Sequence, residues 1–260
     1  MKHSFVFLIA VAAVLSAVVM GQQKSSGHPD FSGIWAYSVD QPPGGIKQTI
    51  NGKAVVGLPD LSGRRPARAE VQGALTSQAA PQYKPEFAAK VKELDANQSR
   101  KDGVFYCGRP GVPRLGPPRK VLQSVNEMVF LYEDMSGDTF RIVPINGKHN
   151  PDLDPSFNGD AIGRWEGEKF VVESVNFVDE TWFGELGYFH SDQMKVIERM
   201  WMQGDQMAYQ VTVDDPKVLA QPWNMAARLI KRSDAQLLES PKCVDSDGAL
   251  LTNSDHHGQR

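Results

Sequence analysis

The feature that most constrains the fold is a succession of short, alternating apolar and polar stretches between residues 120 and 238. Such stretches suit β-strands and are too short for ordinary helices. Turn pairs such as Asn146-Gly147 and Gly204-Asp205 separate them, and the connections are too short for the crossovers of a parallel sheet. The pattern therefore favours a mainly β fold, an antiparallel barrel or sandwich, and of these we expect a single antiparallel β-barrel. The expected strands are 121–124, 127–132, 139–144, 162–165, 169–177, 194–202, 207–213, 223–231 and 236–238.

Fewer elements are expected before residue 120. Residues 31–39 have the pattern of a strand with Trp35 on its inner face, and residues 41–83 form a long excursion with one short strand at 54–58. Pro85 begins a helix over 85–96, in which the apolar residues Phe87, Val91 and Leu94 recur on one face. The Pro-rich run 107–118 predicts an extended strap before the strands, because proline fixes φ and donates no hydrogen bond.

The N-terminus has the pattern of a signal peptide. Lys2 and His3 precede an almost unbroken apolar run over 5–20, which suits a signal peptide and is short for a membrane span. We therefore expect removal of residues 1–21, a periplasmic or secreted location, and no integral membrane association afterwards. The expected organisation is a disordered segment over 22–29, one β-barrel domain over 30–245 and a flexible tail over 246–260.

The net charge of the chain disfavours some classes of binding partner. The formal net charge is −3 for the whole chain, and removing Lys2 with the signal peptide makes it more negative by one unit. There is no basic block, so nucleic acid is not an expected partner. A small-molecule ligand or substrate is the expected partner, and the sequence leaves the oligomeric state open.

Two cysteines, Cys107 and Cys243, lie at the edges of the expected folded core. In an exported chain a disulfide between them is the expected arrangement, and two buried thiols are the alternative. The bond would close a loop of 136 residues, counted as 243 minus 107. Neither cysteine has another cysteine nearby, which disfavours a metal site.

Polar residues within and beside the strands mark a candidate site. Glu198 and Arg199 are neighbours on one strand and must point to opposite faces, so one of them is expected inside. His149, His190 and Asp214 or its neighbour Asp215 stand at strand ends, which meet at the rim of a barrel. We expect His190, Glu198, His149 and Asp214 to be catalytic by proton transfer, with Arg141 binding the substrate. The alternative is a set of rim residues that only cap turns and pair with one another.

Aromatic residues extend this candidate site. Trp165, Trp182, Tyr188 and Tyr209 suit contacts with an aromatic or carbohydrate-like substrate. Residues 177–190 carry several aromatics without clear periodicity, which indicates a loop over the barrel mouth. The alternative is a segment that simply packs on the barrel.

Cofactor and metal chemistry find little support. Residues 152–160 alternate oxygen-bearing side chains as a calcium loop does, but Phe157 and Gly163 stand where such a loop needs Gly and Glu. No spacing supports a metal site at His149 and His190, and no phosphate-binding glycine motif occurs. We expect neither a metal nor a cofactor.

Two parts of the chain resemble known families. Asp30-Phe-Ser-Gly-Ile-Trp35 is similar to the opening of lipocalin-like (calycin) barrels, where a Gly-x-Trp motif starts the first strand and the Trp closes one end against a basic side chain. This implies that Arg228 or Lys231 packs on Trp35. The runs 157–173, 190–199 and 211–216 resemble a family of exported bacterial proteins, which implies export and one β domain and transfers no catalytic role.

Two function classes follow. The first is a cofactor-independent acid–base enzyme, namely a lyase, isomerase or hydrolase. The second is a non-catalytic binding protein for a small apolar ligand. Titratable groups that converge in the interior would favour the enzyme, since a carrier tolerates an apolar lumen.

Overall fold

A computed structural model describes residues 27–36, 47–50, 53–56, 80–134, 137, 139–225, 227–240 and 243. Strands dominate this part of the chain. They are β1 (Gly33–Ile34), β2 (Lys47–Ile50), β3 (Lys53–Val56), β4 (Lys120–Gln123), β5 (Glu127–Tyr132), β6 (Thr139–Pro144), β7 (Asp160–Glu166), β8 (Lys169–Val175), β9 (Lys195–Gln203), β10 (Gln206–Asp214), β11 (Trp223–Asn224) and β12 (Arg228–Ile230). The helical elements are η1 (Pro85–Phe87), α2 (Ala88–Ala96), α3 (Gln98–Lys101) and η2 (Gly103–Tyr106).

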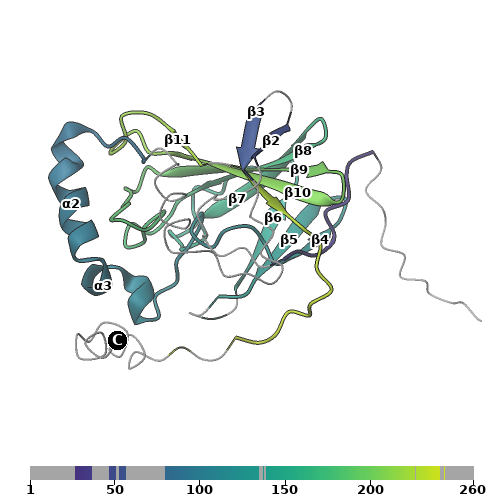
Figure 1. Cartoon of the computed structure of the whole chain (residues 1–260), viewed down its shortest axis with the longest axis horizontal. Coiled ribbons are helices and arrows are strands. Elements are labelled where there is room, and N and C mark those ends of the chain that lie inside the picture. Colours follow the sequence, from purple (N-terminus) through teal and green to yellow (C-terminus); the bar gives the residue numbers. More distant parts are fainter. Residues whose placement is uncertain are drawn as a thin grey trace, which may run out of the picture.

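Two antiparallel sheets form the body of the molecule (Figure 1). The first has the order β1-β4-β5-β6, and the second has the order β11-β10-β9-β8-β7 with β12 also paired to β10. The strands β2 and β3 form a separate hairpin. The predicted mainly β, antiparallel fold is therefore confirmed.

The two sheets are linked by short bridges at both edges. Trp35, directly after β1, bridges Arg232, which lies two residues after the end of β12. At the other edge Ile145 bridges Gly163 of β7, and the Asn146 amide donates to the Gly163 carbonyl at 2.7 Å. Apart from the β2–β3 hairpin, the described strands make two sheets. The expected single closed barrel is not found, because isolated bridges rather than ladders join these two sheets.

Strand alternation places one apolar core between the sheets. On β5 the residues Met128, Phe130 and Tyr132 are buried, while Glu127 is exposed. On β9 the buried residues Val196, Glu198 and Met200 alternate with partly exposed neighbours. Every second side chain of a strand faces the same side, so both inner faces contribute to one core.

The side chain of Arg232 packs across the Gly-x-Trp segment and accounts for both its glycine and its tryptophan. Arg232 lies over the Trp35 ring at 4.5 Å, and its guanidinium donates to the Ser32 carbonyl at 2.7 Å. Gly33 has φ +128°, and a Cβ there would lie 2.7 Å from the Arg232 guanidinium. The basic partner of Trp35 is therefore Arg232 rather than Arg228 or Lys231, because the residue opposite Trp35 in the bridge shares its face.

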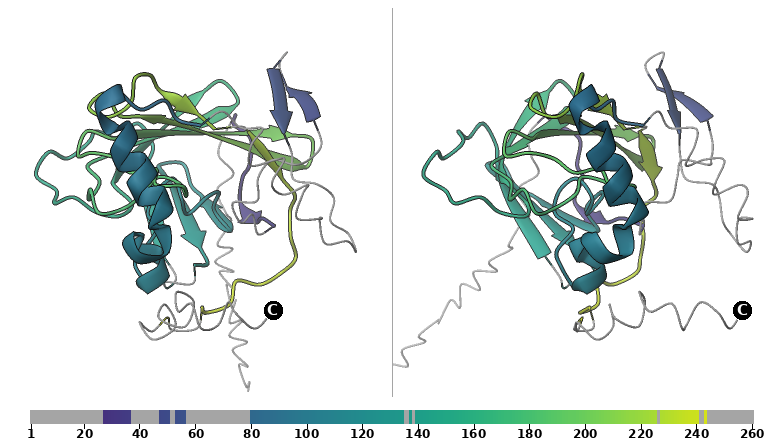
Figure 2. Two further views of the ribbon diagram at one scale, coloured as in Figure 1. Left: turned by 60° about the vertical axis from the view of Figure 1, so that its left-hand side comes forward. Right: turned by 90° about the vertical axis from the view of Figure 1, so that its left-hand side faces the viewer.

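The helix α2 stands across one end of the sheets (Figures 1 and 2). The expected helix over 85–96 is confirmed as η1 followed by α2, and Phe87, Val91 and Leu94 pack against the core. The loop over 182–189 lies against this helix, since a Cβ on Gly187 would be 2.5 Å from the Val91 carbonyl.

From β4 to β10 the strand boundaries lie within two residues of the expected ones. Of the expected strand 31–39, the described part forms a strand only at β1. The expected strand 223–231 is two strands, β11 and β12, and residues 236–238 are not a strand. Within the expected excursion 41–83 the structure describes β2 and β3 and then residues 80–83. Tyr37 and Val39, the signal peptide and the tail over 246–260 lie outside the described residues. The strands β11 and β12 pair with different parts of β10, which explains the interruption.

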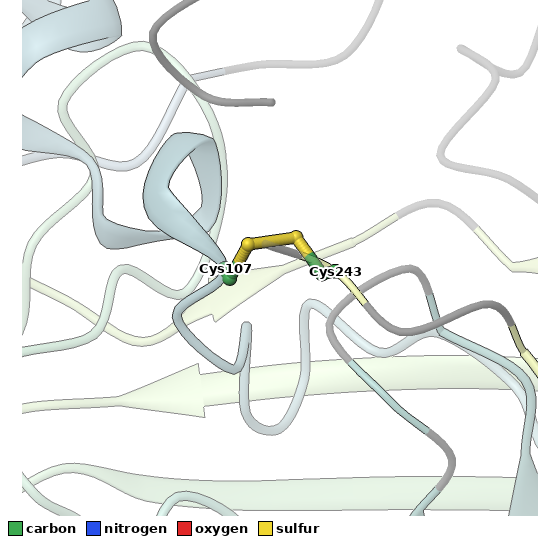
Figure 3. Close-up of a disulfide and its surroundings, with 2 residues drawn as sticks. All are labelled: Cys107 and Cys243. Carbon is green, nitrogen blue, oxygen red and sulfur yellow. A yellow bond between two sulfur atoms is a disulfide. The ribbon is translucent and has the colours of Figure 1, made fainter. Parts of the chain in front are cut away.

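The predicted disulfide is present (Figure 3). Cys107 follows η2, and Cys243 lies in the C-terminal segment, which runs back below the sheets toward η2 (Figure 1). The bond joins residues 136 apart and ties the C-terminal segment to the start of the Pro-rich strap. In that strap Arg114 forms an ion pair with the buried Asp102 at 2.7 Å.

Candidate functional site

A charged pair lies inside the core between the two sheets. Arg141 on β6 and Glu198 on β9 form an ion pair at 2.7 Å, and their side chains are 3% and 1% exposed. The strands come from different sheets, so this contact spans the interior. Arg199 lies on the other face and donates to Thr212 at 3.0 Å, so Glu198 is the inward residue of that neighbouring pair.

Three further polar groups complete a network. Arg141 donates to the Tyr132 hydroxyl at 3.1 Å and to the Ser174 hydroxyl at 2.8 Å. The Tyr209 hydroxyl donates to Glu198 at 2.8 Å. We call these five residues, Arg141, Glu198, Tyr132, Ser174 and Tyr209, the interior network. Each comes from a different strand, so the register of both sheets determines it.

The network has the electrostatics of a compensated ion pair. Burial by itself lowers the pKa of Arg141, but Glu198 and Tyr132 together outweigh this effect and raise that pKa above its ordinary value. Burial and then the charge of Glu198 raise the pKa of Tyr209. Burial also raises the pKa of Tyr132, against the opposing effect of Arg141. Both tyrosines are therefore neutral donors near neutral pH.

One donor of this network is left over. Nε of Arg141 is buried and has no hydrogen-bond partner among the described residues. The guanidinium also lies 5.8 Å from the centre of the Phe130 ring. A buried N–H without an acceptor costs about 1–3 kcal/mol, so an additional acceptor at this point would be stabilising.

His190 belongs to a different group of contacts. Nδ1 lies 2.9 Å from the Ser191 carbonyl and therefore carries the proton, because a carbonyl only accepts. Nε2 is then the acceptor for the Thr181 hydroxyl at 2.7 Å. Burial lowers the pKa of His190, so the ring is neutral at neutral pH. Among the described residues His190 and Glu198 share no hydrogen-bond or ion-pair partner.

The two aspartates after β10 differ in role. Asp214 lies on the outer face opposite Lys195, away from the face of Glu198. Asp215 is fully buried and accepts from the amide and hydroxyl of Ser191 at 2.7 and 2.8 Å. Asp215 therefore positions the segment that carries His190, and the structure does not bring Asp214 to the interior network.

His149 forms a third group on the outside of the second sheet. Its Nδ1 lies 3.0 Å from Asp160, and its Nε2 lies 3.5 Å from Glu173. Glu173 is opposite Ile197, which neighbours the inward-facing Glu198, so Glu173 lies on the outer face of the second sheet. Because His149 contacts Glu173 on that face, it does not reach the interior network. Among the described residues there is no group of three or more His, Cys, Asp or Glu side chains arranged to hold a metal ion.

The aromatic residues of the candidate site lie in three places. Tyr209 is in the interior network, and Trp165 packs on Phe170 and stacks on His28 at 4.2 Å. This stacking places His28, within the segment expected to be disordered, against the sheet. Trp182 and Tyr188 lie in the loop beside α2, where Tyr188 packs against Trp223. The loop over 177–190 packs closely, since its Trp182, Phe183 and Phe189 are buried.

Several residues at these sites were not singled out from the sequence. Tyr132 and Ser174 could have been found from strand alternation, because they follow Phe130 and Val172 by two positions. Thr181 and Ser191 lie outside regular elements, so no periodicity marks them. Their roles follow from the packing of distant loops.

Comparison with protein-family models, with curated proteins and with solved structures gives no match. The part of the chain that the structure describes contains no helix with the length and apolar character needed to cross a bilayer. The features that bear on function are therefore the interior network, the contacts of His190 and the contacts of His149.

Proposed function

We propose that this protein is an exported binding protein that holds a small, mainly apolar molecule between its two sheets. The observation that carries this proposal is the interior network, which places an arginine, a glutamate and two tyrosine hydroxyls inside an otherwise apolar core. Burying an ion pair costs several kcal/mol per ion before pairing offsets it, and apolar residues would pack equally well. A binding role explains why polar groups are kept there.

The enclosure in this proposal is a lipocalin-like barrel. Its support is the pair of bridges that link the two sheets, Trp35 with Arg232 and Ile145 with Gly163. The contact of Arg232 with Trp35 matches the basic residue that the Gly-x-Trp resemblance implies. The signal-like N-terminus and the disulfide support export to an oxidising compartment.

The network indicates the chemistry of the ligand. Arg141 and Glu198 compensate each other, so a charged ligand would add an unpaired charge to the buried interior. A neutral ligand adds none. Nε of Arg141 offers one unused donor, which a carbonyl or hydroxyl oxygen would satisfy. The proposed ligand is therefore a neutral aromatic or aliphatic molecule with one acceptor oxygen.

The test compares two probes of nearly equal shape, 2-acetylnaphthalene and 2-ethylnaphthalene, by calorimetric titration. We expect the wild type to bind the ketone about tenfold more tightly, which corresponds to about 1.4 kcal/mol. The matched variant is Arg141→Met with Glu198→Met, which removes both charges and should stay folded. It should bind both probes equally. Failure of the wild type to bind either probe, or the same preference in both proteins, would contradict the proposal.

The acid–base enzyme is a second candidate, favoured by the neutral His190 and its contact with the Thr181 hydroxyl. A neutral imidazole acceptor next to a hydroxyl is the arrangement of a base that activates a nucleophile. Hydrolysis of 4-nitrophenyl acetate by the wild type and by His190→Gln tests it. Turnover lost in a variant with an unchanged melting curve would support catalysis, whereas equal rates would contradict it.

A further inference from the structure

The outer face of the first sheet carries an exposed apolar surface. Leu122 on β4, Phe140 on β6 and Ile142 on β6 are 43%, 64% and 51% exposed. Val129 and Leu131 on β5 lie between them and are partly exposed. We call these five residues the outer apolar face. Contiguous apolar surface of this kind on a folded domain marks an interaction site.

The register arranges this face in rows across the strands. Leu122, Val129 and Ile142 form a middle row, because each is directly opposite the next. Lys120, Leu131 and Phe140 form the row on one side of it. On the other side Glu127 pairs with Pro144, and the Ser124 amide donates to the Glu127 carbonyl at 2.9 Å.

The two ends of the face carry opposite charges. Lys120 contributes a positive charge beyond the middle row on one side, and Glu127 contributes a negative charge beyond it on the other. Neither has an ion-pair partner among the described residues. An apolar centre with opposite charges at its ends is complementary to a copy of itself turned end over end.

We propose that the outer apolar face is the interface of a homodimer, in which a second copy packs face to face. The two-fold axis of this dimer lies between the two faces and runs perpendicular to the strands. It places each strand of one copy over the same strand of the other, and it exchanges the two outer rows. The middle row then meets the same row of the second copy. Lys120 of each copy then lies near Glu127 of the other copy. The two residues are not directly opposite each other, because Lys120 is on β4 and Glu127 is on the neighbouring strand β5, about 4.8 Å to the side.

The dimer is expected to be weak. The apolar centre consists of five side chains, and stable interfaces bury about 800 Å² on each partner. It therefore dissociates on dilution. The face lies on the side of the sheet opposite the interior network, since Arg141 is buried between the exposed residues Phe140 and Ile142. Variants on this face thus leave the proposed ligand contacts in place.

Sedimentation of the purified full chain over a range of concentrations tests this proposal. We expect a monomer–dimer equilibrium in the wild type and a dissociation constant at least about tenfold higher in Ile142→Asp. The matched control is Leu153→Asp, which adds the same charge at an exposed apolar residue outside this face. Leu153 is 49% exposed, and the control should dimerise as the wild type does. A wild type that is monomeric at every concentration, or equal effects of both variants, overturns the proposal.

A charge reversal keeps the test decisive if Ile142→Asp does not fold. Lys120→Glu places two carboxylates beside each other across the interface and should weaken the dimer. Adding Glu127→Lys restores opposite charges and the original net charge, so dimerisation should return. No recovery in the double variant would overturn the proposed orientation of the two copies.

Discussion

At the scale of single residues, the ion pair of the interior network makes the core sensitive to the loss of either partner alone. Arg141 and Glu198 compensate each other at 2.7 Å, with almost no exposure to solvent. Removing one partner leaves a buried charge unpaired, whereas removing both leaves an apolar core of similar volume.

The Arg141→Met variant should therefore be about 3–5 kcal/mol less stable than the wild type, because the buried Glu198 loses its cation. The double variant with Glu198→Met should recover most of this loss. Urea denaturation of the four proteins of this cycle measures both effects. A double variant as unstable as the sum of its singles would show that the two side chains do not act as a pair.

His190 makes stability depend on pH. Burial lowers its folded-state pKa below the ordinary value of 6.5, so the unfolded chain binds a proton that the folded chain rejects. The stability that His190 contributes is complete above pH 6.5 and is lost as the pH falls below it. His190→Gln should show a flatter decline of unfolding free energy on acidification than the wild type, measured by urea denaturation at a series of pH values. Identical slopes would contradict this role.

At the scale of elements, strands were predictable and their interruptions were not. Burial alternates along β5, along most of β6 and in the first half of β9, and each of these strands lies within one residue of its expected range. The strand β10 also lies within one residue of its expected range, although residues on both of its faces are buried. The expected strand 223–231 divides because its two halves pair with opposite ends of β10. Pairing partners are distant in sequence, and local periodicity carries no information about them.

The contact between α2 and the aromatic loop gives a prediction at this scale. Gly187 has φ +76°, and a Cβ there would lie 2.5 Å from the Val91 carbonyl. Gly187→Ala should loosen the loop over 182–189 and raise its amide exchange rate. Gly167→Ala is the control, since Gly167 has φ +64° with open space around it. If the amides of the loop over 182–189 exchanged at equal rates in the two variants, the close contact of Gly187 with α2 would not hold this loop in place.

At the scale of the whole molecule, the disulfide joins the C-terminal segment to the start of the Pro-rich strap. Its loop of 136 residues corresponds to about 5 kcal/mol in the chain-entropy model, and native disulfides commonly contribute about 2–5 kcal/mol. Replacing Cys107 and Cys243 together by Ser should lower the unfolding free energy by an amount in that range. Urea denaturation of the oxidised wild type and the variant measures it. Equal midpoints would contradict the prediction.

The site shows a similar division between what was and was not predictable. Strand alternation established that either Glu198 or Arg199 faces inward, and the structure assigns Glu198. Alternation could not bring Arg141 to Glu198, because these strands belong to different sheets. It also grouped His149, His190 and Asp214 at one rim, whereas they lie in separate environments.

The sequence by itself determined the antiparallel β class, the position of the helix and the partner of each cysteine. These depend on periodicity, on proline and on the number of cysteines, all of which are local or countable properties. Only the tertiary structure decided the arrangement in two sheets, the Arg232 contact with Trp35 and the composition of the interior network. Each of these depends on which distant strands pair and in which register, and that is decided by the packing of the whole core.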